Sequence, residues 1–218
     1  MGAKANQRSE SVNNYRKIAL MVLLVALVAL AGCSCKEYEE QIMQLDAQIA
    51  ELQKEIANDE AVIAERNQMV DELNSNLDGC KSDNAILIEE NEEVIMITVQ
   101  SELGFVASGV GVREEMVPVL EGIAMTINDH PGWDIYVEGY TDDRKVKEEY
   151  QEYYPSNWEL GAFRSAAVVR YMTGQMGLDP ERFAAVSFGP YRAIADNDTA
   201  EGRKANRRVR FMMYKSNY

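Results

Sequence analysis

Three charged side chains in the C-terminal half of the chain have the types needed to hold a zwitterion. Asp142 ends the segment Gly139-Tyr140-Thr141-Asp142, Arg164 lies in a stretch with helical spacing, and Arg207 belongs to the basic segment Asn206-Arg207-Arg208-Val209. A carboxylate binds an ammonium group, and a guanidinium binds a carboxylate, by charge-assisted hydrogen bonds. The set therefore suits a ligand with both an amine and a carboxylate. The alternative is a plain surface salt bridge, which contributes only about 0 to 1 kcal/mol.

The segments that must position these residues alternate between strands and helices. Period-two alternation of apolar residues predicts strands, and apolar residues three or four positions apart predict helices. The predicted strands are 94–99, 134–138, 183–188 and 209–214. One predicted helix spans 116–127, and a second follows the N-cap residue Ser156, with Gly174 and Gly177 marking its end. The order β-α-β-α-β-β indicates an α/β (α+β) domain of two layers, with two helices packed on one mixed sheet.

The second of these helices has a clear start. Ser156 followed three residues later by Glu159 is a capping box, which satisfies backbone donors at a helix N-terminus. Asn157 and Arg164 are seven residues apart, nearly two full turns, so we expect them to project from one helix face. Gly161 lies between them, and we expect it to leave room for the ligand.

The N-terminus has the features of an export signal. Basic residues precede the wholly apolar run Ile18 to Leu30, which is shorter than the roughly 20 residues of a membrane span. The run ends in Leu30-Ala31-Gly32-Cys33, which resembles the lipobox of bacterial lipoproteins. That resemblance implies a signal peptide over 1–32 and a lipidated N-terminus over 33–37, with the lipid on Cys33. An uncleaved anchor helix is the alternative.

A heptad pattern follows, and we expect residues 38–93 to form a spacer. Apolar residues at every seventh position form the seam of a coiled coil. The a positions are Ile42, Ile49, Ile56, Ile63, Val70 and Leu77, and the d positions are Leu45, Leu52, Asp59, Arg66, Leu73 and Cys80. This pattern favours a parallel two-stranded homo-oligomer, and a helix is expected to resume over 85–93. A single helix that folds back on the C-terminal domain is the alternative.

Composition excludes several classes of function. The chain has a net charge of −14, and an acidic protein repels the phosphates of nucleic acids. Its single histidine and its cysteines, Cys33, Cys35 and Cys80, show no zinc spacing and no Cys-His nucleophile pair. We therefore expect no metal, no cofactor and no enzymatic activity. Cys80 could pair with Cys35, pair with a second copy, or stay free.

The C-terminal motifs together resemble a known family. Three motifs occur in order, namely Gly139-Tyr140-Thr141-Asp142, then Asn157 with Leu160 and Arg164, then Gly202-Arg203 with Asn206-Arg207-Arg208-Val209. Residues 94–214 are similar to the OmpA-like peptidoglycan-binding domain. That family includes peptidoglycan-associated lipoproteins and the periplasmic part of flagellar stator subunits.

The resemblance implies a ligand and its binding residues. In the family, an aspartate and an arginine at the positions of Asp142 and Arg164 hold diaminopimelate of the cell-wall stem peptide. Residues matching Thr141, Asn157 and Arg207 line the family's pocket. The chain departs from the family pattern at Tyr140, Gly161 and Ser165, which we expect to tune the pocket. An insertion over 143–155 makes the stator-type members the most similar.

Two whole-chain functions fit this organisation. The first is a non-enzymatic lipoprotein of the outer membrane that faces the periplasm and tethers the membrane to peptidoglycan. The second is a stator-like transmembrane subunit of an ion-driven motor. Such a subunit carries an acid within its membrane helix, and residues 18–30 contain no ionisable side chain. The tether is therefore the favoured hypothesis.

Overall fold

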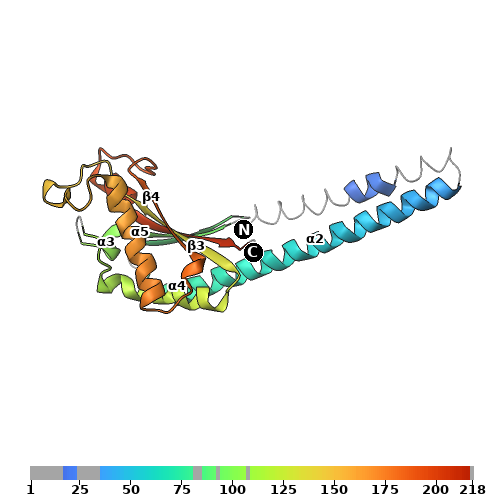
Figure 1. Cartoon of the computed structure of the whole chain (residues 1–218), viewed down its shortest axis with the longest axis horizontal. Coiled ribbons are helices and arrows are strands. Elements are labelled where there is room, and N and C mark those ends of the chain that lie inside the picture. Colours follow the sequence, from blue (N-terminus) through green and yellow to red (C-terminus); the bar gives the residue numbers. More distant parts are fainter. Residues whose placement is uncertain (1–16, 24–34, 81–84, 92–93, 107–108, 217–218) are drawn as a thin grey trace. The chain divides into compact units, whose positions relative to one another are not determined.

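The computed structural model describes residues 17–23, 35–80, 85–91, 94–106 and 109–216. The chain divides into two compact units, Met1–Glu60 and Ala61–Tyr218 (Figure 1). Helix α2 (Cys35–Asn76) begins in the first unit and ends in the second. The later elements are η1 (Asp78–Cys80), β1 (Ile86–Glu90), β2 (Val94–Gln100), α3 (Ser101–Gly104), η2 (Glu114–Met116), α4 (Val117–Asp129), β3 (Trp133–Tyr140), η3 (Glu148–Tyr150), α5 (Asn157–Gly174), η4 (Pro180–Arg182), β4 (Phe183–Gly189), α6 (Ala200–Asn206) and β5 (Arg208–Lys215).

The second unit is built on one mixed sheet, as the sequence predicts. Its strand order is β1-β2-β5-β3-β4. Strand β5 pairs antiparallel with β2 and β3, whereas β3 and β4 are parallel and are joined through α5. Helix α5 lies across β3 and β4 (Figure 1). Because β3 and β4 are parallel, their carboxyl ends meet at one edge of the sheet.

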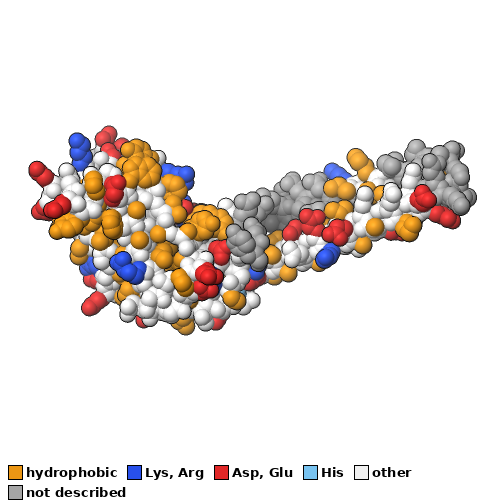
Figure 2. Space-filling model, viewed as in Figure 1, with side chains coloured by type: hydrophobic (Ala, Val, Ile, Leu, Met, Phe, Trp, Pro, Cys, Tyr) orange, Lys and Arg blue, Asp and Glu red, His pale blue; other side chains and the backbone are white. Residues whose placement is uncertain are grey.

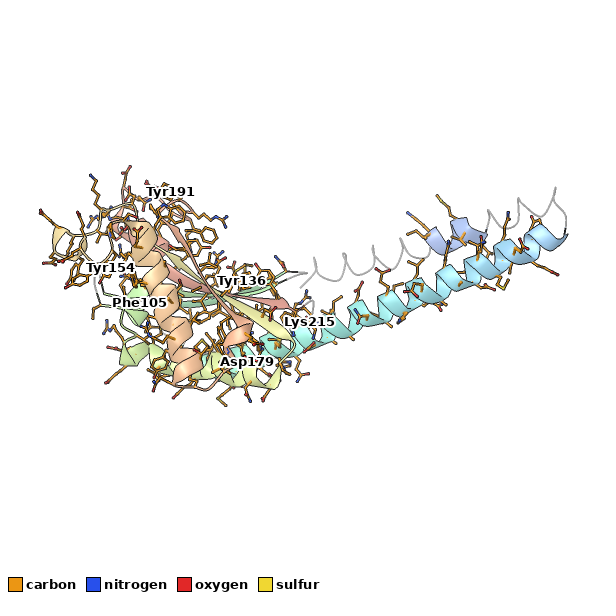
Figure 3. The ribbon with its side chains drawn as sticks, viewed as in Figure 1. Phe105, Tyr136, Tyr154, Asp179, Tyr191 and Lys215 are labelled. Carbon is orange, nitrogen blue, oxygen red and sulfur yellow. The ribbon has the colours of Figure 1, made fainter. Side chains whose placement is uncertain are left out.

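The core lies between the helices and one face of this sheet. The apolar side chains that recur at helical spacing through η2 and α4 are at most 1% exposed, as are their neighbours on the strands. These residues are Met116, Val119, Leu120, Ile123, Ile127, Ile95, Ile97, Val99, Ile135, Val137, Val209, Phe211 and Met213. Tyr136 alternates with the buried residues of β3 and is exposed on the opposite face (Figure 3).

The last turns of α2 belong to the second unit. Met69, Leu73 and Leu77 are fully buried in its core, and Asn76 donates a hydrogen bond to Thr126 of α4. The predicted alternative, a helix that packs on the C-terminal domain, therefore describes this part of α2. The heptad pattern could not distinguish a coiled coil from a helix packed on the domain. Leu73 and Leu77 fit both the seam of a coiled coil and the buried face of a helix on a globular core.

The earlier turns of α2 keep an exposed seam. Predicted a and d residues Ile42, Ile49, Leu52 and Ile63 remain exposed in the single chain. Figure 2 shows apolar side chains at intervals along this helix. A coiled coil between copies would cover them, so homo-oligomerisation through this part of α2 stays a prediction.

A strand occupies the place where the helix was expected to resume. Residues 86–90 form β1, which pairs antiparallel with β2. The prediction of a helix over 85–93 is therefore wrong. Ile86 and Ile88 face the core while Leu87 and Glu89 face outward, which is the period of a strand.

The signal and lipidation predictions lie mostly outside the described residues. Residues 17–23 are helical, whereas Cys33 and its flanking residues are not described. No helix within the described ranges combines the length and the apolar character needed to cross a membrane. Cys80 is a free thiol at the edge of the core.

Candidate ligand-binding site

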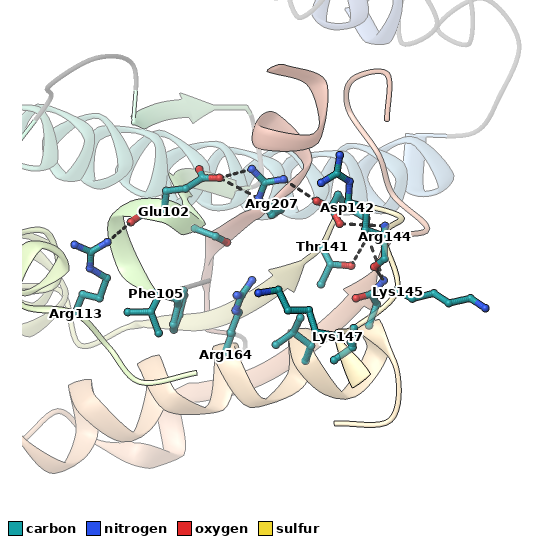
Figure 4. A pocket seen from close by; sticks show the side chains of 15 residues that line it. Glu102, Phe105, Arg113, Thr141, Asp142, Arg144, Lys145, Lys147, Arg164 and Arg207 are labelled. Atoms are coloured by element: carbon teal, nitrogen blue, oxygen red, sulfur yellow. Dashed lines mark hydrogen bonds and ion pairs between the residues drawn. The ribbon is translucent and has the colours of Figure 1, made fainter. Parts of the chain in front are cut away.

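A pocket of about 430 Å³ opens beside the carboxyl end of β3 and the first half of α5 (Figure 4). All five predicted binding residues line it. Its lining is Ser101, Glu102, Phe105, Val106, Arg113, Thr141, Asp142, Arg144, Lys145, Val146, Lys147, Asn157, Leu160, Arg164 and Arg207. The structure thus brings together side chains from five separate segments of the chain.

Asp142 is held just beyond the carboxyl end of β3. The backbone N–H of Thr141 donates to the carbonyl of Gly189 at the end of β4. Oδ1 of Asp142 accepts a hydrogen bond of 3.1 Å from the backbone N–H of Arg144. These contacts fix Asp142, a residue that is only 8% exposed.

Arg207 joins this carboxylate to a second acid. Its Nη1 donates to Oδ2 of Asp142 at 2.6 Å, and its Nε donates to Oε1 of Glu102 at 3.0 Å. Burial alone would lower the pKa of Arg207, but the hydrogen bonds with Glu102 and Asp142 outweigh burial and raise it. One guanidinium is therefore shared by two carboxylates.

The environment of Arg164 differs from that of Arg207, because burial and not ion pairing dominates it. It is 4% exposed, and its Nε donates to the carbonyl of Gly109 at 3.0 Å. Its guanidinium carbon lies 5.1 Å from the ring centroid of Phe105. Burial, with repulsion from Arg207, lowers the pKa of Arg164 to about 10. Within the described part of the chain, Arg164 forms no ion pair with a carboxylate.

Thr141 and Asn157 brace the loop that carries Asp142. Oγ1 of Thr141 donates to the backbone carbonyl of Asp142 at 2.9 Å. Nδ2 of Asn157 donates to the carbonyl of Asp142 at 3.3 Å and to that of Arg144 at 2.8 Å. The predicted capping box of Ser156 and Glu159 is confirmed and places Asn157 in the first turn of α5. Both residues therefore position the carboxylate and also line the pocket.

Gly161 faces the sheet and not the pocket. A Cβ on Gly161 would meet Oγ of Ser187, and a Cβ on Gly139 would clash with the backbone carbonyl of Gly161. The two glycines allow α5 to approach β3 closely. The expectation that Gly161 leaves room for the ligand is therefore wrong, because helical spacing alone could not show which side of α5 the sheet covers.

Tyr140 and Ser165 also lie away from the pocket. Tyr140 stacks on Phe188, donates to Glu138 at 2.5 Å and has the guanidinium of Arg208 3.7 Å from its ring centroid. Burial beside Glu138 raises the pKa of Tyr140 to about 12. Ser165 is buried and donates to the carbonyl of Ala162. Neither touches the pocket, so the expectation that these departures tune it directly is wrong.

The basic segment before β5 also divides between roles. Arg207 reaches the pocket, whereas Arg208 lies under Tyr140 on the other face of the sheet. Asn206 is fully buried and hydrogen-bonds the loop at Ile194, Ala195 and Asn197. Only one residue of the segment therefore acts in the pocket.

Sequence reasoning missed two groups of pocket residues. Glu102, Phe105 and Arg113 come from the region between β2 and α4, and nothing in the sequence links them to the pocket residues of the later segments. Arg144, Lys145 and Lys147 come from the insertion directly after Asp142. Their nearness to Asp142 in the sequence was the signal that could have found them.

The pocket separates charge in a way that suits a zwitterion. Figure 4 shows Glu102, Arg207 and Asp142 linked in a row, with Arg164 across from them. The row carries two negative charges and one positive charge, and Arg164 carries an uncompensated positive charge. An ammonium at the row and a carboxylate at Arg164 would each meet an opposite charge. Within the described ranges, no cluster of three side chains suited to hold a metal occurs.

Comparisons with known proteins show what this chain is similar to. Residues 105–207 match the model of the OmpA family. The chain is 35% identical to the uncharacterized protein YtxE of Bacillus subtilis over 59% of this chain and 51% of that protein. It is 30% identical to Motility protein B of the same species over 61% of this chain and 50% of that protein. The chain thus spans about half the length of these relatives.

Solved structures share the fold. The structure of a MotB like protein from Desulfovibrio vulgaris is 28% identical, with a TM-score of 0.65, and the match covers 72% of this chain and 97% of that one. The cell wall anchor of the T6SS from Pseudomonas aeruginosa is 28% identical, with a TM-score of 0.59, over 66% of this chain and 97% of that one.

Proposed function

We propose that the pocket binds peptidoglycan through the diaminopimelate of the stem peptide, and the match of residues 105–207 to the model of the OmpA family supports this. The observation that carries this proposal is Arg164, a buried guanidinium without a carboxylate partner in the described residues. A buried, unpaired charge costs several kcal/mol unless something compensates it. A ligand carboxylate in the pocket would do so.

The ligand is oriented by the two ends of the pocket. Its carboxylate pairs with Arg164, and its ammonium binds at Asp142. The Asp142 carboxylate accepts from Arg144 and Arg207, but two carboxylate oxygens offer about four acceptor positions. Thr141, Asn157 and Arg207 act by holding Asp142 in place. This is binding and not catalysis, so the role is non-enzymatic.

The remainder of the chain makes this domain a tether. Lipid on Cys33 anchors the protein in the outer membrane facing the periplasm, and α2 separates the membrane from the wall. Several acyl chains, at about 0.8 kcal/mol per buried methylene, make such an anchor long-lived. Paired copies along α2 would add avidity to individually weak binding. The similarity to the cell wall anchor of the T6SS from Pseudomonas aeruginosa supports an anchoring role.

A stator-like subunit of an ion-driven motor is the second candidate. The similarity to Motility protein B of Bacillus subtilis favours it. The absence of an ionisable residue from 18–30 favours the tether. Mass spectrometry of the protein from its host distinguishes them: a lipidated Cys33 at the N-terminus supports the tether, and an uncleaved N-terminus supports the motor subunit.

Co-sedimentation with purified diaminopimelate-type peptidoglycan tests the binding proposal. We expect Asp142→Asn to lose most of the pelleted fraction. Asp143→Asn is the matched control, because Asp143 is the adjacent acid but is exposed and does not line the pocket. Equal pelleting by both variants would reject Asp142 as a binding residue.

A further inference from the structure

Positive charge gathers around this pocket although the whole chain is acidic. Among the described residues that line it, six are basic and two are acidic, whereas the chain has 22 basic and 36 acidic residues. The basic members are Arg113, Arg144, Lys145, Lys147, Arg164 and Arg207. A ligand with a single ammonium and a single carboxylate would not require this excess.

Internal partners neutralise only some of these cations. Arg207 pairs with Glu102 and Asp142, and Arg113 pairs with Glu115. Within the described ranges, Arg144, Lys145 and Arg164 form no ion pair with a carboxylate. Lys147 reaches Glu149 only at 3.9 Å, with both side chains more than 60% exposed, and such a contact contributes little.

The insertion that supplies three of the cations, residues 143–155, is fixed to the domain. Val146 is buried in a small cluster with Tyr154 and Leu160 of α5. Its carbonyl accepts from Nε2 of Gln151 at 2.7 Å, and the carbonyl of Arg144 accepts from Asn157 at 2.8 Å. The backbone at 144–147 therefore holds a set place at the rim of the pocket.

The direction of the side chains separates two of these lysines. In Figure 4, Lys147 extends toward Arg164, whereas Lys145, which also lines the pocket, extends away from Arg164. Arg164 and Lys147 thus present two cations at the basic end of the pocket, with no carboxylate between them among the lining residues.

We propose that Lys147 makes the pocket specific for stem peptides with a second free carboxylate near the one bound by Arg164. This inference rests on the proposed function of the pocket. Amidation converts a carboxylate to a neutral group, so it would remove the charge attraction to Lys147. The ligand class is therefore a stem peptide whose carboxyl groups are free and not amidated.

The test measures the affinity of the full chain in detergent for three synthetic stem tripeptides of alanine, glutamate and diaminopimelate. One has all carboxylates free, one has the glutamyl α-carboxyl amidated, and one has one diaminopimelate carboxyl amidated. We expect at least one amidation to weaken binding by about fivefold or more. The ratio of the affinity for the free peptide to the affinity for that amidated peptide should fall below about twofold in Lys147→Gln. Lys145→Gln, the matched control, should preserve the ratio of the wild type.

The outcomes separate this inference from the proposed function. If the free and amidated peptides bind equally well, the specificity is wrong while peptide binding stands. If Lys147→Gln keeps the full ratio, or Lys145→Gln loses it equally, the assignment to Lys147 is overturned. If no peptide binds, both the inference and the proposed function fail.

Discussion

Arg207 donates a 2.6 Å hydrogen bond to the carboxylate of Asp142, 65 residues earlier in the chain. The same guanidinium binds Glu102 from the region after β2. The contact joins the start of β5 to the end of β3, two strands that are neighbours in the sheet. It thereby fixes the acidic end of the pocket, which the proposed binding mode requires.

Arg207→Gln should weaken binding to the diaminopimelate-containing tripeptide by about tenfold. Hydrogen bonds to charged groups contribute about 1.5–3 kcal/mol, and the partial exposure of Arg207 places its contribution near the lower limit. A loss of about 1.4 kcal/mol in binding free energy corresponds to a tenfold loss of affinity. Calorimetric titration measures the affinity. Arg170→Gln, on the exposed side of α5, serves as the control, and equal affinities for the two variants would show that Arg207 does not support the site.

Leu73→Ala should destabilise the second unit by about 2–5 kcal/mol, the usual cost of deleting a buried leucine side chain. Leu73 is fully buried, whereas Leu52 on the same helix is 53% exposed. Urea unfolding, monitored by near-ultraviolet circular dichroism, gives the free energy of unfolding. Leu52→Ala should leave that free energy unchanged and weaken self-association. A similar effect of both variants on unfolding would contradict the assignment of residues 61–76 to the domain.

The sequence predicted the parts of the fold that follow from local periodicity. The spacing of Val119, Leu120 and Ile123 defines the buried face of α4, and Ser156 with Glu159 defines the start of α5. The five predicted binding residues line one pocket. The resemblance of the three ordered motifs to the OmpA-like domain implied this grouping.

Other features depend on distant parts of the chain and could not be read locally. The run Ile86-Leu87-Ile88 is compatible with a helix or a strand until its pairing with β2 is known. The contact of Glu102 with Arg207 spans 105 residues and has no sequence signal. The orientation of Gly161 depends on the position of the sheet, which the helical spacing does not contain.

Gly139→Ala should destabilise the domain by about 1–3 kcal/mol, as expected for overpacking. The added Cβ would clash with the backbone carbonyl of Gly161, which cannot move without shifting α5. Gly174→Ala is the matched control, because a Cβ there would meet nothing within 4 Å. Thermal unfolding compares the two, and a Gly139→Ala variant as stable as the wild type would refute the close helix–strand contact.

The free energy of unfolding of the second unit should decrease as the pH is lowered below about 4.5. Burial alone would raise the pKa of Glu65, but hydrogen bonds with Lys215 and His130 outweigh it and lower the pKa below its ordinary value of 4.5. A hydrogen bond with Gln68, followed by contact with His130, lowers the pKa of Glu72. A carboxyl group whose pKa is lower in the folded state than in the unfolded state stabilises the fold at pH values above its unfolded-state pKa. That stabilisation is lost as the pH falls through the folded-state pKa.

Glu65→Gln should therefore lower stability at neutral pH and flatten the decline below pH 4.5. The free energy of unfolding in urea, measured at several pH values between about 3 and 7, gives both quantities. Glu51→Gln, at an exposed position of α2, should leave the profile unchanged. A Glu65→Gln profile parallel to that of the wild type would show that the contacts of Glu65 with Lys215 and His130 do not stabilise the fold.

The most direct test of peptidoglycan binding concerns Arg164, whose buried charge lacks a carboxylate partner within the described residues. The measurement is calorimetric titration of the full chain in detergent with the free tripeptide of alanine, glutamate and diaminopimelate. Arg164→Ala should abolish detectable binding while the exposed control Arg170→Ala binds like the wild type. Binding by Arg164→Ala within twofold of the wild type would contradict the proposed function.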